Sequence, residues 1–213
     1  MCQYDFISKA QFTSKNEFLE ESKDIAEDLF KKYCINCNGK EFYFAEIEFY
    51  YYNDNSEELK VKWNENTYPR ECQAGDIFYH LSGMDICFNS KLPQNFKEKE
   101  DCYGGGILIR SIVEIDTNGN KIVTVGPLTC ANKMLNACKG KCMPKLRISK
   151  KLNYTPNPQK TFRYLGKTDF DLIEKGENRD GNLKLAFYDS GINKDSWNKA
   201  RSSYYEKRIM RVK

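Results

Sequence analysis

The sequence lacks any apolar run of about 18 residues or more, which excludes a membrane-spanning helix. It also lacks a basic start followed by an apolar segment, so we expect no secretory signal. An intracellular location follows as an expectation, either cytoplasmic or close to the nucleoid or in the nucleus. Without a secretory route, the 9 Cys are expected to be reduced thiols rather than a disulfide framework.

Histidine is almost absent. His80, the only one, lies in an apolar segment, which favours a structural role and gives no basis for a Ser/His/Asp catalytic arrangement. Hydrophobic residues nevertheless make up 40% of the chain, with 14 Tyr and 13 Phe, which is a globular composition. A length of 213 residues fits one domain spanning residues 1–213.

The charge is divided unevenly along the chain. Residues 1–107 carry 12 Lys and Arg against 20 Asp and Glu, a net charge of −8, whereas residues 108–213 carry 22 against 10, a net charge of +12. Between Asp116 and Asp169 there is no acidic residue and there are 11 basic ones. A solvated lysine-rich loop is one interpretation. A surface that faces a polyanion is the other, and nucleic acid is then the first candidate partner.

Hydrophobic periodicity predicts few helices and many strands. The expected helices are Asn16–Lys32, capped by Ser14 or Asn16, a short one at Ala131–Ala137 and another near Trp197. The expected strands are Phe42–Tyr52, Ile77–Leu81, Ile86–Asn89, Ile107–Ile115, Lys121–Val125, Leu183–Tyr188 and Tyr204–Met210. Turns are expected at Asn38-Gly39, Ser82–Asp85 and Asn118-Gly119, whereas 90–103 and Asn153–Gln159 are expected to be loops. Many adjacent strands with few helices favour one α+β domain with an antiparallel or mixed sheet.

Strand alternation sorts the residues of Phe42–Tyr52 onto two faces. Ala45, Ile47 and Phe49 form an apolar face, and Glu46, Glu48 and Tyr50 share the other. The second face is either solvated or the wall of a functional site.

The same alternation in Ile107–Ile115 groups Leu108, Arg110 and Ile112. A guanidinium among aliphatic side chains is expected to reach a carboxylate, and Glu46 or Glu48 supplies one if the strands are neighbours. Extension of Arg110 to solvent at a sheet edge is the alternative.

Two cysteine pairs and one glycine run are weaker indications of a metal site or a phosphate-binding loop. Cys34/Cys37 and Cys138/Cys142 have spacings that two halves of a four-cysteine zinc site can have, although chance spacing is easy with 9 Cys, and we predict no metal and no cofactor. Gly104-Gly105-Gly106 precedes an expected strand rather than a helix, so it is not a phosphate-binding loop and is expected to be a flexible lead-in.

Five segments carry more specific motifs: A-E-I-E-F-Y at Ala45–Tyr50, T-Y-P-R at Thr67–Arg70, the hairpin segment Tyr79–Asn89, I-L-I-R at Ile107–Arg110 and G-P-L-T at Gly126–Thr129. In this order they resemble the E-x-E-A-Y, T-P-R-N, Y-x-x-Y-G-M-x-x-C-x-N, V-L-I-R and G-P-G-x-L motifs of the alkyladenine (methylpurine) DNA glycosylase family. The tail around Gly191, Trp197 and Tyr204 is loosely similar to the ending of that family. The resemblance implies one α+β domain with a curved antiparallel sheet flanked by short helices.

The resemblance also implies roles for individual residues. Glu48 takes the place of the carboxylate that activates water, and Arg110 takes the place of the arginine that holds this water. Tyr50 and Tyr79 would sandwich a base rotated out of the duplex, and Asn89 would stand at the floor of the pocket. No cofactor is implied, and the implied partner is double-stranded DNA, bound by a monomer.

Two positions depart from the family pattern. Ser82 stands where the family inserts a tyrosine into the duplex, which leaves Met84 as the nearest apolar candidate for insertion. Leu59 stands at the spacing of a family histidine that contacts the base. These changes would suit another modified base, or a protein that binds DNA without cutting it.

The function predicted from the sequence is therefore that of a monofunctional DNA glycosylase, which flips a modified or damaged base for excision in DNA repair. A non-catalytic nucleic-acid-binding protein on the same scaffold is the first alternative. A small-molecule-binding or protein-binding module is the second.

Overall fold

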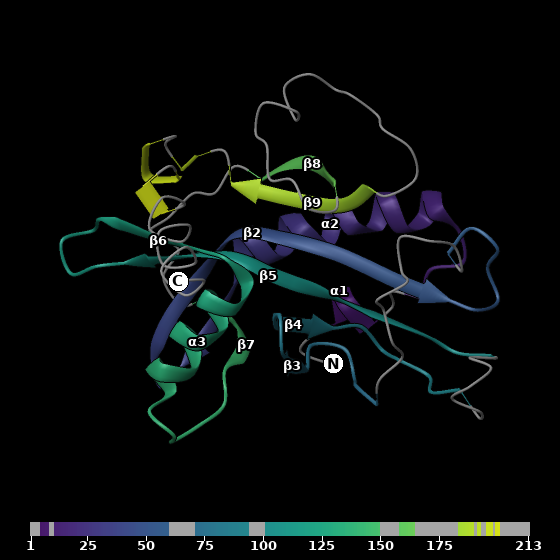
Figure 1. Ribbon diagram of the computed structural model, residues 1–213, viewed down its shortest axis with the longest axis horizontal. Coiled ribbons are helices and arrows are strands. Elements are labelled where there is room, and N and C mark those ends of the chain that lie inside the picture. The colour runs from purple at the N-terminus through teal and green to yellow at the C-terminus, as the bar shows by residue number, and fades with distance from the viewer. Residues whose placement is uncertain are drawn as a thin grey trace, which may run out of the picture.

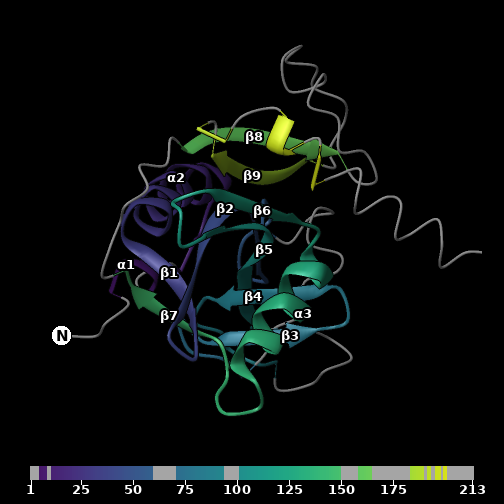
Figure 2. The ribbon, with the colours of Figure 1, turned by 90° about the vertical axis from the view of Figure 1, so that its left-hand side faces the viewer.

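The computed structural model describes residues 5–8, 11–59, 71–93, 101–149, 158–164, 183–189, 191–192, 195–197 and 199–200. Their fold is α+β, with a curled antiparallel sheet and few short helices, as the sequence predicted (Figures 1 and 2). No helix in this part of the chain has the length and apolar character needed to cross a membrane.

Twelve elements are formed by the described residues. The helices are α1 (Asp5–Ser8), α2 (Lys15–Lys32) and α3 (Pro127–Cys138). The strands are β1 (Tyr33–Cys37), β2 (Lys40–Asn53), β3 (Ile77–His80), β4 (Gly83–Cys87), β5 (Tyr103–Ile115), β6 (Lys121–Val125), β7 (Lys145–Ile148), β8 (Pro158–Tyr164) and β9 (Leu183–Asp189).

The sheet is organised around its two longest strands, β2 and β5, which pair with each other over most of their length. The strand order is β3-β4-β5-β2-β1-β7, with β6 paired to β5, β9 paired to β2 and β8 paired to β9. Every pair among the described strands is antiparallel. Figure 2 shows α2 beside β1 and β2, and α3 beside β4 at another part of the sheet.

Helix α2 forms where the apolar periodicity predicted it and packs against the main core. Ser14 caps its N-terminus, because its hydroxyl accepts a hydrogen bond from the backbone N–H of Glu17 at 3.2 Å. Glu17 accepts a further bond from the backbone N–H of Thr13 at 2.7 Å, which lowers the pKa of Glu17. The ring of Phe18 stacks against Tyr51 of β2, with 6.3 Å between centroids. The helix thereby covers one face of β2 with apolar side chains.

Two register shifts around Glu46 change which face of the sheet the flanking residues occupy. Phe44 pairs with Ile112, Glu46 with Ser111 and Ile47 with Ile109. Ala45 is therefore an extra residue in β2, and Arg110 is an extra residue in β5. Such β-bulges bend the strand and redirect side chains.

The bulges correct two sequence predictions, because strict alternation does not hold across them. Ile47 and Phe49 belong to the main core, whereas Ala45 packs in a second cluster around Trp197. In β5, Ile112 lies in the main core rather than on the face that carries Arg110.

Most turns confirm the predictions. Asn38 and Gly39 form the tight turn between β1 and β2, with φ values of 53° and 86°. Asn118-Gly119 lies in the turn between β5 and β6, and β6 has its predicted bounds. The hairpin turn after β3 is shifted: it consists of Leu81 and Ser82, so β4 starts at Gly83 instead of Ile86.

Several element boundaries differ from the predictions. The three glycines 104–106 lie inside β5 and are not a lead-in, α3 starts four residues earlier than expected, and β1 was not expected. Residue Pro158 of the predicted loop begins β8, and residues 195–197 and 199–200 are helical near Trp197. The segment Thr67–Arg70 and the expected strand Tyr204–Met210 lie outside the described residues.

Candidate functional site

The candidate site is built on one row of residues that crosses four strands. Leu108 of β5 pairs with Glu48 of β2 on one side and with Asp85 of β4 on the other, and Asp85 pairs with Phe78 of β3. Side chains of directly paired residues point to the same face of a sheet. Segments up to 60 residues apart in the sequence thus place Glu48, Asp85 and Phe78 on one face.

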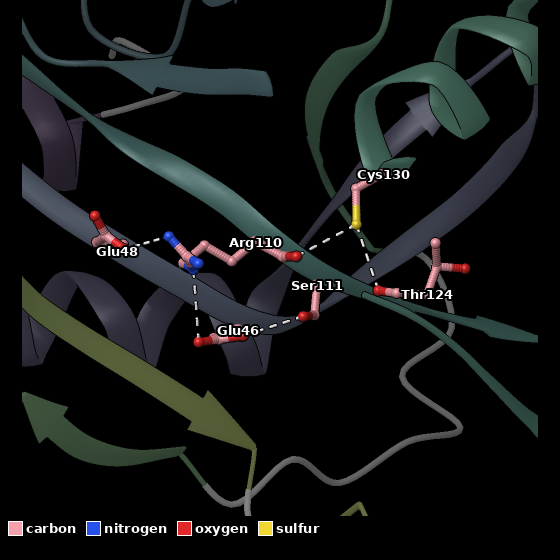
Figure 3. Close-up of polar contacts among 6 residues, drawn as sticks. All are labelled: Glu46, Glu48, Arg110, Ser111, Thr124 and Cys130. Atoms are coloured by element: carbon pink, nitrogen blue, oxygen red, sulfur yellow. Dashed lines mark hydrogen bonds and ion pairs between the residues drawn. The ribbon is translucent and has the colours of Figure 1, made fainter. Parts of the chain in front are cut away.

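Beside this row, two residues after Leu108 in β5, Arg110 contacts two carboxylates (Figure 3). Its Nη1 lies 2.6 Å from Oε2 of Glu48, and its Nε lies 3.6 Å from Oε1 of Glu46. The hydroxyl of Ser111 donates to Oε2 of Glu46 at 3.1 Å. The predicted ion pair between Arg110 and the Glu46/Glu48 face is therefore confirmed. The catalytic roles of Glu48 and Arg110 stay predictions.

Burial makes this cluster energetically demanding. Glu48 is 1% exposed, Glu46 is 6% exposed, and the Arg110 side chain is only 21% exposed. A buried carboxylate without a cation costs several kcal/mol, so the position of Arg110 between the two acids offsets much of that cost. The bulge in β5 makes the arrangement possible, because it places Arg110 and Ser111 together beside two carboxylates that are two residues apart on β2.

A second polar group lies on the same face and was missed by the sequence analysis. The hydroxyl of Tyr50 donates a hydrogen bond to Oδ2 of Asp85, and Nε2 of His80 lies 3.1 Å from Oδ1 of the same carboxylate. Asp85 is fully buried, whereas the His80 side chain is 27% exposed. The ring of Phe78 stacks on the imidazole with 6.2 Å between centroids.

The absence of a side chain at Gly106 allows Tyr50 to reach Asp85 across β5. Tyr50 pairs with Gly106, and a Cβ at Gly106 would lie 3.0 Å from the Tyr50 hydroxyl and 3.3 Å from Cβ of Asp85. The glycine run of β5 thus makes room for an aromatic ring that crosses one strand to bond with the next.

We expect Gly106→Ala to destabilise the protein by about 1–3 kcal/mol, because the added methyl displaces the Tyr50 hydroxyl in a packed site. Urea denaturation measures the change. The matched control is Gly106→Ala in a Tyr50→Phe background, where the hydroxyl is absent and the cost is expected to fall. Equal costs in the two backgrounds would show that the close approach of Tyr50 is not responsible.

The other predicted base-contacting residues lie farther from Glu48 on the sheet. Tyr79 pairs with Met84, so strand alternation points it to the face opposite the row of Glu48, and it is 43% exposed. Asn89 lies two residues beyond the end of β4, where its carboxamide oxygen accepts a hydrogen bond from the backbone N–H of Ala74 at 2.8 Å. The structure therefore brings together Glu48, Tyr50 and Arg110, but does not bring Tyr79 to them.

The two residues predicted to insert into DNA also differ in position. Met84 is 0% exposed in the main core, so its side chain is not available for insertion, and this part of the prediction is corrected. Ser82 lies in the exposed turn, where its backbone N–H donates to Nδ1 of His80 at 3.2 Å. Its neighbour Leu81 is 94% exposed and is the apolar side chain that the turn presents to solvent.

Basic residues of the acid-free stretch are exposed on β6, after α3 and on β7, and β7 lies at the edge of the sheet opposite β3. Five of them are exposed on β6, the end of α3 and β7: Lys121, Lys139, Lys141, Lys145 and Arg147. The start of α3 lies against the β3–β4 hairpin, because a Cβ at Gly83 would lie 2.7 Å from Cβ of Pro127. Lys133 is engaged instead with Glu114, at 3.0 Å.

The cysteine pairs do not assemble into one group. Cys34 and Cys37 are three residues apart in β1, so they face opposite sides of the sheet. Cys37 lies in the main core within hydrogen-bonding reach of Cys138, which also contacts Cys142, whereas Cys34 packs in the second cluster. Within the described ranges, no group of three or more His, Cys, Asp or Glu side chains is arranged to hold a metal ion.

The thiols of β1 and α3 are held in their protonated form by burial. Burial raises the pKa of Cys34 to about 12, with a smaller contribution from Glu41, and burial also raises the pKa values of Cys37 and Cys130. Sγ of Cys130 lies 3.3 Å from the carbonyl oxygen of Thr124 and 3.5 Å from that of Arg110 (Figure 3). Because the thiolate is the reactive form, these cysteines are packing residues rather than nucleophiles.

Comparison with known proteins assigns no family to the chain. The chain matches no protein-family model, no curated protein and no solved structure. The link to the alkyladenine DNA glycosylases therefore stays a resemblance, carried by the sequence motifs.

The sequence analysis did not identify Asp85 and His80 as site residues. Their place in the site becomes clear only from the pairing of β3, β4 and β5. Asp85 lies in the predicted hairpin turn by sequence, and only its pairing with Leu108 shows that it belongs to the row of Glu48. His80 was expected to be structural because its segment is apolar. The turn is two residues shorter than predicted and β4 starts at Gly83, so Asp85 lies in β4 opposite β3, where His80 was expected.

Proposed function

We propose that this protein is a DNA N-glycosylase, which rotates a modified base out of double-stranded DNA and hydrolyses its N-glycosidic bond. The observation that carries the proposal is the 2.6 Å contact between Arg110 and the buried carboxylate of Glu48, on the face that also carries Tyr50. The E-x-E-x-Y and I-L-I-R motifs that the glycosylase resemblance rests on are the segments that supply these three residues.

The chemistry requires a fixed carboxylate next to the sugar. A water oxygen bonds to C1′ as the bond from C1′ to the base nitrogen breaks, and the electron pair of that bond leaves with the base. Glu48 takes the proton that the water loses, and a proton from solvent neutralises the departing base. The carboxylate also faces the positive charge that develops on the sugar, so it stabilises the transition state more than the ground state.

Tyr50 is the residue on this face that fits contact with the base. Rotation of a nucleotide out of the duplex costs a few kcal/mol. Stacking of a base on an aromatic ring returns about 1–3 kcal/mol. Because the Tyr50 ring lies over Gly106 and is anchored at Asp85, it offers a fixed surface two residues from Glu48 on the same strand.

The β3–β4 hairpin and the basic residues after α3 and on β7 suit two separate parts of the grip on DNA. Leu81, at the tip, is the apolar side chain that we propose fills the gap left by the rotated base, in place of Met84. The exposed lysines at the end of α3 and on β7 would contact phosphates, and phosphate contacts position a protein without reading sequence.

The proposal is tested with a panel of duplexes that each contain one modified base. Incubation with the protein followed by alkaline cleavage reveals abasic sites, and we expect cleavage at one or more of the modified bases. Binding to the same duplexes is expected to weaken with salt by about 0.9 log units per phosphate contact for each log unit of salt. Leu81→Ala is expected to lose excision from duplex DNA more than from single strands.

The outcomes separate the alternatives. Salt-dependent binding without abasic sites on any duplex would favour the non-catalytic nucleic-acid-binding protein. Absence of binding to DNA or RNA at low salt would remove nucleic acid as the partner and favour a small-molecule-binding or protein-binding module. Excision by Leu81→Ala at the wild-type rate would exclude Leu81 from the mechanism. The role of Glu48 is tested separately by its own substitution.

A further inference from the structure

Asp85 links two side chains that come from different strands and that the reaction above does not require to be linked. One of its oxygens accepts the Tyr50 hydrogen bond, and the other lies 3.1 Å from Nε2 of His80. The Tyr50 hydroxyl thus bonds to one carboxylate oxygen and the imidazole of His80 lies next to the other, and Asp85 has no exposed surface. Proton donors next to a buried carboxylate stabilise it, so a proton on the His80 nitrogen that faces Asp85 is favoured.

The contacts of His80 determine where the imidazole carries its proton. The backbone N–H of Ser82 donates to Nδ1 at 3.2 Å, and a backbone N–H can act only as a donor. Nδ1 must therefore supply a lone pair, and a neutral imidazole then has its proton on Nε2, the atom that faces Asp85. The turn Leu81-Ser82 thus sets the tautomer of His80 from one side and Asp85 sets it from the other.

We propose that Asp85 is a positioning residue of the candidate site, which fixes the ring of Tyr50 over Gly106 and holds His80 as the Nε2–H tautomer against the β3–β4 hairpin. The role of this network in catalysis rests on the proposed glycosylase function. The contacts among Tyr50, Asp85 and His80 do not depend on that function. A ring held in place before a planar base arrives does not lose freedom on binding, which favours stacking. The same network ties the hairpin tip to the row that carries Glu48.

The single histidine makes the network directly observable. In protein labelled with 15N at histidine, long-range 1H–15N correlation spectra distinguish a protonated ring nitrogen from an unprotonated one, and His80 is the only source of signal. We expect one tautomer, protonated at Nε2, in the wild-type protein near neutral pH. A wild-type spectrum that shows the Nδ1–H form, or an average of both forms, would overturn the proposal without any variant.

Substitutions then test the role of Asp85 itself. In Asp85→Asn the charge beside Nε2 is lost while the backbone N–H of Ser82 still faces Nδ1, so we expect Nε2–H to remain the main tautomer with its 15N and 1H resonances shifted. Asp76→Asn is the matched control, because this exposed aspartate precedes β3 on the same hairpin, and its spectrum is expected to equal that of the wild type. Unchanged His80 signals in Asp85→Asn would contradict the proposal. If Asp85→Asn does not fold, Tyr50→Phe supplies the second variant. In this variant we expect the tautomer of His80 to be unchanged and its resonances to shift.

Activity gives a separate measurement. Tyr50→Phe keeps the aromatic ring but loses its anchor at Asp85, so we expect KM to rise about tenfold with a smaller change in kcat, a loss typical of one hydrogen bond to a charged group. An equal fall in kcat with KM unchanged would contradict a positioning role. Absence of excision in the wild type, together with the expected tautomer, would instead reject the glycosylase proposal and leave the network intact.

Discussion

Glu48→Gln is expected to reduce base excision by about 10²–10⁴-fold while DNA binding stays within a few-fold of the wild-type affinity. The magnitude is that of removing a carboxylate that accepts a proton in the transition state. Glutamine has the same shape and still accepts a hydrogen bond from Nη1 of Arg110, so the fold is expected to remain. Single-turnover excision assays and binding titrations on the same modified duplex measure the two quantities.

The matched control is Glu46→Gln, which makes the same change two residues away on β2. Glu46 also contacts Arg110, at 3.6 Å, and accepts a hydrogen bond from Ser111. If Glu48 carries the chemistry, Glu46→Gln keeps excision within about tenfold of the wild type. Equal losses in the two variants would mean that the net charge around Arg110 matters and that Glu48 has no special place, and full activity of Glu48→Gln would exclude it from the reaction.

The sequence was sufficient to predict the partners of the central ion pair, but not the β-bulge that brings them together. A guanidinium in an apolar strand demanded a carboxylate, and Glu46 and Glu48 were the acids on the facing strand. The bulge that brings Arg110 and Ser111 together has no signature in residue type, because it depends on how two long strands align. For the same reason Ala45 and Ile112 were assigned to the wrong faces.

The second half of the site depended on where the β3–β4 hairpin turns. The turn was predicted at Ser82–Asp85 from its small and polar residues, but the chain turns at Leu81-Ser82. The earlier and shorter turn makes residues 83–85 part of β4, where Met84 lies in the core and Asp85 on the face of Glu48, and Tyr79 pairs with Met84.

Arg110→Ala is expected to lower the free energy of unfolding by about 3–5 kcal/mol, the largest stability effect that we predict for a single substitution. The variant leaves Glu46 and Glu48 buried beside each other without the cation that separates them. Arg110→Lys is expected to be intermediate, because an ammonium group provides a point charge and cannot reach both carboxylates as a planar guanidinium does. Urea denaturation measures each change.

The cause of this loss is tested by removing the acids together with the cation. In Glu46→Gln/Glu48→Gln neutral amides replace both carboxylates, so Arg110→Ala in that background is expected to cost much less than Arg110→Ala costs in the wild type. A cost that is the same in both backgrounds would assign the loss to packing of the arginine stem and not to charge. Neutralising the acids is expected to recover stability but not excision, so the same set of variants distinguishes a carboxylate cluster kept for folding from one kept for catalysis.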